Sequence, residues 1–274
     1  MDIVIAIAIL GGLGVVFGLV LAAASKMFYV ETDPKLEKLN ETLPGANCGG
    51  CGYAGCNGYA EAVLAGEAEI GLCNSGGNEC AQKMAEIMGV QIGEVKRKVA
   101  YVRCVGYHRV DSDGQEKGSK KKAKYEGFQD CLAASKVGGN GPIACKFGCL
   151  GFGTCVKACQ QDAISIVNGV ALVDREKCIG CMACAKLCPR KLIAQADYDK
   201  KVYVPCAPHA KGAVTVRGCS DGGIGCGLCV KICPEKAISI DRNLARIDPA
   251  KCTDCGLCAT ACPKKLIQII TDEN

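Results

Sequence analysis

Four cysteines and a proline in the second half of the chain have the spacing of iron–sulfur ligands. Cys178, Cys181, Cys184, Cys188 and Pro189 follow the C-x2-C-x2-C-x3-C-P pattern of bacterial 4Fe–4S sites. The run returns at Cys252, Cys255, Cys258, Cys262 and Pro263. A tight loop can point three thiolates at one cube, while the fourth cysteine, by then on a helix, reaches a different cube. These residues therefore indicate one-electron redox chemistry.

Composition supports a metal protein. The chain has 274 residues with 24 cysteines and two histidines, and the three-cysteine runs favour metal binding in a reducing compartment over disulfides. Zinc is the alternative, but zinc sites pair two distant C-x2-C knuckles, whereas three cysteines in one loop suit a cube. The net charge of +5 could attract an acidic redox partner or the membrane surface, and no motif indicates nucleic-acid binding.

The N-terminus predicts a membrane anchor. Positions 3–24 are 22 consecutive uncharged, mostly apolar residues, which as a helix reach about 33 Å and span a bilayer core. A cleaved signal peptide is the competing interpretation, but no positive charge precedes the run and the run is too long. Lys26, Lys35 and Lys38 follow it, so the positive-inside rule predicts a single pass through the cytoplasmic (inner) membrane, with the soluble part facing the cytoplasm.

A second cysteine group follows the expected anchor. Four thiols and no histidine are spaced C-x2-C-x4-C-x16-C, among glycines that let the backbone approach a cluster, and we expect one 4Fe–4S cluster with zinc as the alternative. The predicted ligands are Cys48, Cys51, Cys56 and Cys73. Helices are expected over 57–66 and 78–89. Cys80 falls on the apolar face of the second helix, which favours a core role, and Cys104 falls on a strand expected over 99–105.

From Cys145 onward the chain repeats itself with an offset of 74 residues. Between the cysteines of each repeat lie two short apolar runs joined by a turn, which predict a β-hairpin. The repeat therefore predicts two tandem ferredoxin-like modules, each able to hold two cubes.

The first motif of each module is irregular. Phe152 and Gly223 stand where a cysteine is expected, and each module carries an extra cysteine at the equivalent place, Cys145 and Cys219. The simplest inference is that the extra cysteine supplies the missing ligand. A cube with three thiolates and an open iron, a lost cluster, and substitution by Cys131 or Cys206 remain as alternatives.

These considerations predict about five 4Fe–4S clusters and no catalytic residues. The four expected ligand sets in the modules are Cys145, Cys149, Cys155 and Cys188; Cys159, Cys178, Cys181 and Cys184; Cys219, Cys226, Cys229 and Cys262; and Cys233, Cys252, Cys255 and Cys258. The thiols left over, expected to be buried and structural, are Cys80, Cys104, Cys131 and Cys206.

The expected fold class is α+β, with a transmembrane helix, a small α-rich 4Fe–4S domain and two ferredoxin-like modules. The expected boundaries are 1–26 for the anchor, 27–110 for the N-terminal domain, 111–130 for a linker, 131–200 for the first module and 201–274 for the second. Within the linker, the lysine-rich stretch 111–124 predicts a solvated loop.

This order of segments resembles the B subunit of the Rnf complex, the ion-translocating ferredoxin:NAD oxidoreductase, in its long form with two modules. The most specific part is N-C-G-G-C-G-Y-A-G-C, followed by Cys73, directly after an anchor. Phe152 and Gly223 depart from the regular ferredoxin pattern and leave the cluster ligands open.

The resemblance implies an electron-transfer subunit of a translocase. Such a subunit takes electrons from reduced soluble ferredoxin and relays them to other membrane subunits and to flavin- and NAD-binding subunits, while the complex moves Na+ or H+. The alternative is a polyferredoxin relay subunit of another membrane redox enzyme. No nucleotide-binding fingerprint is found in the soluble part, so substrate conversion is expected in partner subunits.

Overall fold

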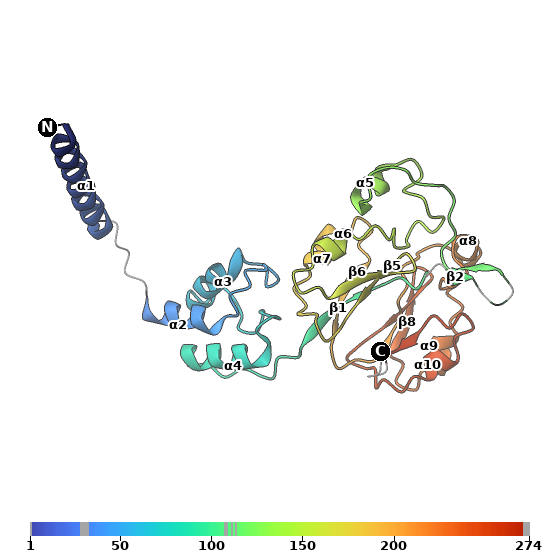
Figure 1. Ribbon diagram of the computed structural model, residues 1–274. Coiled ribbons are helices and arrows are strands. Elements are labelled where there is room, and N and C mark those ends of the chain that lie inside the picture. The colour runs from blue at the N-terminus through green and yellow to red at the C-terminus, as the bar shows by residue number, and fades with distance from the viewer. Residues whose placement is uncertain (1, 28–32, 107–108, 111, 113, 271–274) are drawn as a thin grey trace.

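The computed structural model describes residues 2–27, 33–106, 109–110, 112 and 114–270 (Figure 1). Helix α1 (Asp2–Met27) contains the predicted anchor. Its stretch from Leu10 to Met27 has a mean hydropathy of 1.8, is long and apolar enough to cross a membrane, and is nowhere buried in the protein. Large apolar side chains such as Leu10 and Leu21 are about two-thirds exposed, so this helix needs an apolar environment outside the chain.

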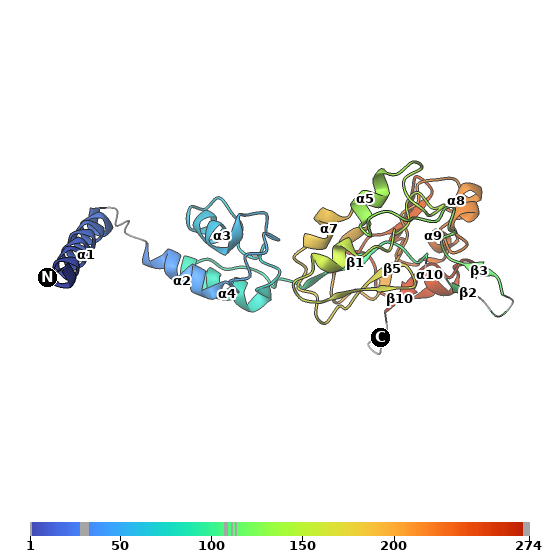
Figure 2. The same cartoon turned by 45° about the horizontal axis from the view of Figure 1, so that its top comes forward.

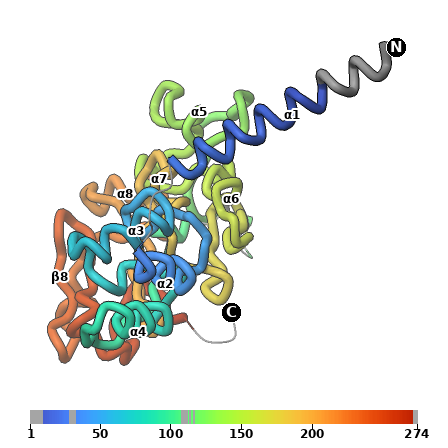
Figure 3. The backbone as a smooth tube through the Cα atoms, turned by 90° about the vertical axis from the view of Figure 1, so that its left-hand side faces the viewer, coloured from blue at the N-terminus to red at the C-terminus, as the bar shows by residue number. Residues whose placement is uncertain are grey.

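Three helices form the N-terminal domain: α2 (Pro34–Thr42), α3 (Gly55–Leu64) and α4 (Gly77–Met88). They pack around Leu39, Tyr59 and Met84, each at most 1% exposed. Asp33 caps α2 by accepting a hydrogen bond from the Lys35 N–H at 2.8 Å, and Pro34 occupies its first turn. In Figure 3 these helices lie in front of the modules. Helices α3 and α4 begin and end within two residues of the sequence prediction.

The first module is built on two antiparallel strand pairs. Strand β1 (Lys98–Val102) pairs with β6 (Ile193–Asp197), and β4 (Ile164–Val167) forms a hairpin with β5 (Val170–Val173). Short helices α6 (Thr154–Lys157) and α7 (Ala183–Leu187) carry cysteines. Thus the segment 27–110, expected to be the N-terminal domain, contains a strand that completes the sheet of the first module.

The second module repeats this plan. Strand β7 (Val202–Tyr203) pairs with β10 (Gln268–Ile269), and β8 (Ile238–Asp241) forms a hairpin with β9 (Leu244–Ile247). The helices are α8 (Gly212–Gly218), α9 (Leu228–Ile232) and α10 (Leu257–Thr260). Ile164 pairs with Val173, and Ile238, 74 residues later, pairs with Ile247, so the predicted hairpins and their repeat are confirmed.

The segment between β1 and α6 contains β2 (Arg109–Val110), β3 (Glu116–Lys117) and α5 (Cys131–Lys136) (Figure 2). The prediction of a solvated loop over 111–124 is wrong around Ser119, which is 7% exposed and forms a β-bridge to Cys219. The neighbouring Lys120 N–H donates to Gly218 O at 3.0 Å, and Lys120 O accepts from the Ala144 N–H at 2.8 Å. Because both modules pair this backbone, Ser119 can lie buried here, while residues 120–124 are exposed as predicted.

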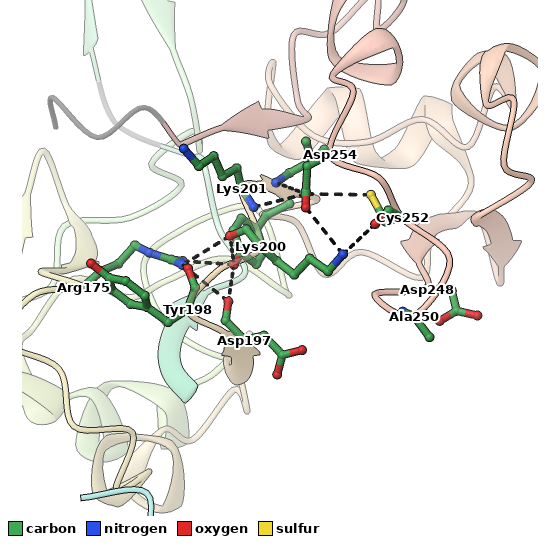
Figure 4. Close-up of polar contacts among 11 residues, drawn as sticks. Arg175, Asp197, Tyr198, Lys200, Lys201, Asp248, Ala250, Cys252 and Asp254 are labelled. Carbon is green, nitrogen blue, oxygen red and sulfur yellow. Dashed lines mark hydrogen bonds and ion pairs between the residues drawn. The ribbon is translucent and has the colours of Figure 1, made fainter. Parts of the chain in front are cut away.

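Polar contacts connect the segment between β6 and β7, which includes Lys200, to both modules (Figure 4). Arg175, just after β5, donates to the Tyr203 hydroxyl at 3.1 Å. Lys200 donates to Cys252 O at 2.6 Å and forms an ion pair with Asp254 at 3.6 Å. Asp254 also accepts from the Val202 N–H at 3.0 Å. The start of β7 is therefore fixed to the cysteine loop of the second module.

Candidate iron–sulfur sites

The structure brings together all four cysteines predicted for the N-terminal domain. One small cavity is lined by Cys48, Cys51, Cys56 and Cys73. The loop that carries the first three closes through Asn47, whose side-chain oxygen accepts from the Cys56 N–H at 2.8 Å. Cys80 is buried beside Cys73. Its hydrogen bond to that thiol is the main cause that lowers the pKa of Cys73 to about 6.

This N-terminal site touches the first module. Cys181 also lines its cavity, and a Cβ atom on Gly50 would lie 2.9 Å from Cys181 O. Lys186 Nζ donates to Gly49 O at 3.2 Å. The N-terminal domain therefore packs directly on the Cys178–Cys184 loop.

The regular site of the first module comprises Cys159, Cys178, Cys181 and Cys184. Burial and, to a smaller extent, the charges of the three neighbouring thiols raise the pKa of Cys184 to about 12. The Ala100 N–H of β1 donates to Cys178 Sγ at 3.3 Å. Gly180 has φ +66° and a Cβ there would lie 2.2 Å from Lys98 O, so glycine is required where this loop crosses β1.

In the second module, the regular cysteines line one cavity. These are Cys233, Cys252, Cys255 and Cys258, so the last cysteine of the first motif lies with three of the second. Cys255 is exposed to solvent, as is Cys226 of the same module, whereas the other 22 cysteines are buried or half-buried.

At the irregular site of the first module, the fourth thiol is the alternative Cys131 instead of the expected Cys145. The cavity of this site is lined by Cys131, Cys149, Cys155 and Cys188, and Cys145 lies elsewhere. Cys131 is the first residue of α5, and its N–H donates to Thr154 Oγ at 2.8 Å, which holds α5 against α6. The sequence offered Cys131 only as an alternative, because it precedes Phe152 by 21 residues and belongs to no motif.

At the irregular site of the second module, Cys229 interacts with Cys226 and Cys262. Burial is the main cause that raises the pKa of Cys229, and the charges of these two thiols raise it as well. A Cβ on Gly223 would lie 2.9 Å from Leu266 Cδ2, so a cysteine side chain at this position would have to displace the end of Leu266. Cys219, the expected replacement, lies in another cavity.

That other cavity is lined by Cys104, Cys145, Cys206 and Cys219. From the sequence, Cys145 and Cys219 are expected at the irregular sites, and Cys104 and Cys206 are expected to be structural. The available signal was a repeated Tyr-Val-x-Cys, which ends at Cys104 and again at Cys206.

The residues present fit iron–sulfur cubes. Among the described residues, no three His, Cys, Asp or Glu side chains are gathered as ligands of one metal ion. Groups of four cysteines without histidine are the ligand chemistry of 4Fe–4S cubes. Backbone N–H groups also donate to the sulfurs, as from Leu192 to Cys188 and from Leu266 to Cys262, each at 3.4 Å.

Comparison with protein families agrees with these sites. The model of an Fe-S cluster domain matches residues 43–75, that of a 4Fe-4S binding domain matches 171–193, and that of a 4Fe-4S dicluster domain matches 224–266. The expected α+β class with ferredoxin-like 4Fe–4S domains is therefore confirmed.

Relatives match along most of the chain. The B subunit of the Na+-translocating ferredoxin:NAD+ oxidoreductase complex of Acetobacterium woodii is 41% identical over 91% of this chain and 73% of its own length. The B subunit of the proton-translocating ferredoxin:NAD+ oxidoreductase complex of Clostridium ljungdahlii is 39% identical over 88% and 82%. The B subunit of the ion-translocating oxidoreductase complex of Methanosarcina acetivorans is 37% identical over 90% of each chain. The resemblance noted in the sequence is confirmed: this chain belongs to the family of B subunits of ion-translocating oxidoreductase complexes.

Proposed function

We propose that this chain is the membrane-anchored iron–sulfur subunit that accepts electrons from reduced ferredoxin and relays them within a membrane complex. That complex couples ferredoxin:NAD oxidoreduction to movement of Na+ or H+. The observation that carries the proposal is the row of cysteine-lined sites that runs from the second module through the first to the N-terminal domain.

The proposed clusters have five ligand sets, which the cavities and the neighbouring thiols support. They are Cys48, Cys51, Cys56 and Cys73; Cys159, Cys178, Cys181 and Cys184; Cys131, Cys149, Cys155 and Cys188; Cys226, Cys229 and Cys262; and Cys233, Cys252, Cys255 and Cys258. When bound, a 4Fe–4S cube takes up and releases one electron at a time, at a potential set by charge, hydrogen bonds and exposure. At the three-thiol set, one iron of a cube would lack a cysteine ligand.

The protein residues hold these sites and exclude water from most of them. Cys155, Cys178 and Cys184 are each at most 8% exposed. A soluble electron donor therefore could not come close to clusters at these sites. Cys226 and Cys255 are the exposed thiols, which makes the second module the proposed entry point. Lys231, Lys236 and Lys265 are exposed close in sequence to its cysteines and would attract an acidic ferredoxin. Lys264 is less suited, because its Nζ donates to Ser220 O at 3.0 Å.

The N-terminal site is the proposed exit toward the membrane subunits. It lies in the domain that follows α1, and its loop packs on the first module through Gly50 and Lys186. Helix α1 is the proposed single-pass anchor in the cytoplasmic membrane, and Lys26, Lys35 and Lys38 favour a cytoplasmic location for the soluble part. We place the start of the first module at Lys98, where β1 begins.

The test is direct oxidation of reduced ferredoxin by the full-length chain in detergent, followed anaerobically by stopped-flow absorbance. A Lys231→Glu/Lys265→Glu variant should oxidise ferredoxin more slowly, and the difference should shrink at high salt. Lys35→Glu/Lys38→Glu, far from the second module in sequence, is the matched control and should leave the rate unchanged. A wild-type chain that takes no electrons from ferredoxin would contradict the proposed function. An unchanged rate in the first variant at both salts would contradict only the docking site.

A further inference from the structure

We propose that Cys104, Cys145, Cys206 and Cys219 hold an additional 4Fe–4S cluster between the two ferredoxin-like modules. This inference depends on one part of the proposed function, namely that the chain binds 4Fe–4S clusters. The four cysteines come from four separate segments and line one cavity. Cys104 and Cys219 are 8% and 5% exposed. None of the four lies within the residues that the 4Fe–4S family models match.

Each module contributes the same two positions to this cavity. Cys145 and Cys219 are equivalent in the 74-residue repeat. Cys104 and Cys206 end the two copies of Tyr-Val-x-Cys, directly after β1 and shortly after β7.

Their hydrogen bonds are equivalent as well. Cys104 Sγ accepts from the Cys149 N–H at 3.4 Å, and Cys206 Sγ accepts from the Gly223 N–H at 3.5 Å. Positions 149 and 223 are again 74 residues apart. The repeat therefore supplies two equivalent pairs of thiols, and both pairs line the same cavity.

The loops that carry these thiols are in contact. A Cβ on Gly218, next to Cys219, would lie 3.3 Å from the backbone of Ala144 and Cys145. Ser119 forms a β-bridge to Cys219, and its neighbour Lys121 forms one to Ile143. The segment once expected to be a solvated linker therefore closes one side of the cavity.

Unpaired polar atoms at the cavity provide an independent observation. Ser119 Oγ and Arg103 Nε are buried without a hydrogen-bond partner, and both residues line this cavity. Ser119 lies beside Gly106, as does Cys104 Sγ. Native proteins rarely leave buried donors unpaired, and cluster sulfurs accept hydrogen bonds, so a cluster here would satisfy both groups.

The site would connect the two modules. Cys104 lies against Cys149 of the Cys131 site, and Cys206 lies against Gly223, three residues before Cys226. A cluster held by these four thiols would accept one electron from a reduced cluster at the Cys226 site, which would be oxidised by one electron. It would pass that electron on to a cluster at the Cys131 site.

The test is the iron and acid-labile sulfide content of anaerobically prepared full-length chain and of three variants, Cys145→Ala, Cys219→Ala and the double variant. The proposal predicts that each single variant loses about four irons and four sulfides, and that the double variant loses no more than either, because both thiols serve one cube. Ser165→Ala, an exposed position in strand β4 outside the cysteine-lined cavities described above, is the control and should lose none.

Other outcomes would overturn the proposal. A double variant that loses about eight irons would mean that Cys145 and Cys219 serve separate clusters, and no loss in any variant would mean that they bind none. If the cysteine variants do not fold, Ser119→Ala provides the second test. It should keep its iron but shift the midpoint of one cluster in an EPR-monitored redox titration, and an unchanged titration would contradict the site. A wild-type chain without iron or sulfide would instead contradict the proposed function as a whole.

Discussion

The rings of Tyr101 and Tyr203 lie 5.2 Å apart at an interplanar angle of 39°. These tyrosines are equivalent in the two copies of Tyr-Val-x-Cys, one in β1 and the other in β7. The two modules thus meet through the same edge of each, directly ahead of Cys104 and Cys206.

Tyr101→Leu should loosen this junction. An aromatic pair contributes about 0.5–1.5 kcal/mol beyond burial, so amide exchange in β7 should rise about two- to tenfold by hydrogen-exchange mass spectrometry. Tyr125→Leu removes a ring pair with Phe152, 5.0 Å between centroids, elsewhere in the chain and serves as the control. Equal exchange in β7 for both variants would show that the Tyr101 contact does not hold the modules together.

Gly50→Ala should separate the N-terminal domain from the first module. The added Cβ would lie 2.9 Å from the backbone oxygen of Cys181, and relieving such overpacking costs about 1–3 kcal/mol. Iron content should stay constant, while electron transfer from the modules to the N-terminal cluster slows in freeze-quench EPR. Gly58→Ala, whose Cβ would meet nothing within 4 Å, should behave as wild type. Identical kinetics in the two variants would argue against contact between these sites as the electron path.

Cys188→Ala and Cys131→Ala should damage the same cluster. Both thiols line the cavity with Cys149 and Cys155, whereas Cys184, only four residues before Cys188, belongs to a different set. EPR spectra of the two reduced variants should lack the same signal and keep the one that Cys184→Ala removes. If Cys188→Ala instead abolishes the Cys184 signal, the crossover between the two sites of the module is wrong.

Tyr59→Phe should weaken the N-terminal domain below pH 10. The Tyr59 hydroxyl donates to Glu69 O at 2.9 Å and accepts from the Leu72 N–H at 3.2 Å, so its removal leaves buried groups unpaired and costs about 1–3 kcal/mol.

The same residue predicts a pH dependence. Burial raises the pKa of Tyr59 to about 12, above its ordinary value of 10. The folded state therefore favours the neutral hydroxyl, and the stabilisation is complete below pH 10 and lost as the pH rises to about 12. Hydrogen exchange in α3 should accelerate across that interval in the wild type and less so in Tyr59→Phe. Parallel pH profiles would contradict this role.

The features that could be predicted from the sequence are those formed by residues close together in the chain. Each regular motif places three cysteines within seven residues, so their spacing alone fixes the loop around Cys178 or Cys252. The hairpins followed from apolar alternation, and the 74-residue repeat carried both predictions from one module to the next. Helix α4, which contains Cys80, was also predicted, because its apolar residues recur at helical spacing.

The parts that the sequence did not predict depend on contacts between distant segments. Strand β1 pairs with β6, which lies about 95 residues later in the sequence. Only this pairing shows that Cys104, just after β1, lies beside the first module. Cys131 reaches its cavity because Asp130 and Thr154 join α5 to α6, a hydrogen bond of 2.6 Å that no spacing rule contains. The lysine-rich stretch around Ser119 is polar in sequence, yet both modules pair its backbone.

The most direct test of the whole account is metal analysis of the anaerobically prepared full-length chain. Six sites with four irons each predict about 24 irons and an equal amount of acid-labile sulfide per chain, with no stoichiometric zinc. Stoichiometric zinc without labile sulfide would contradict the account, because cysteine sites filled with zinc cannot carry electrons.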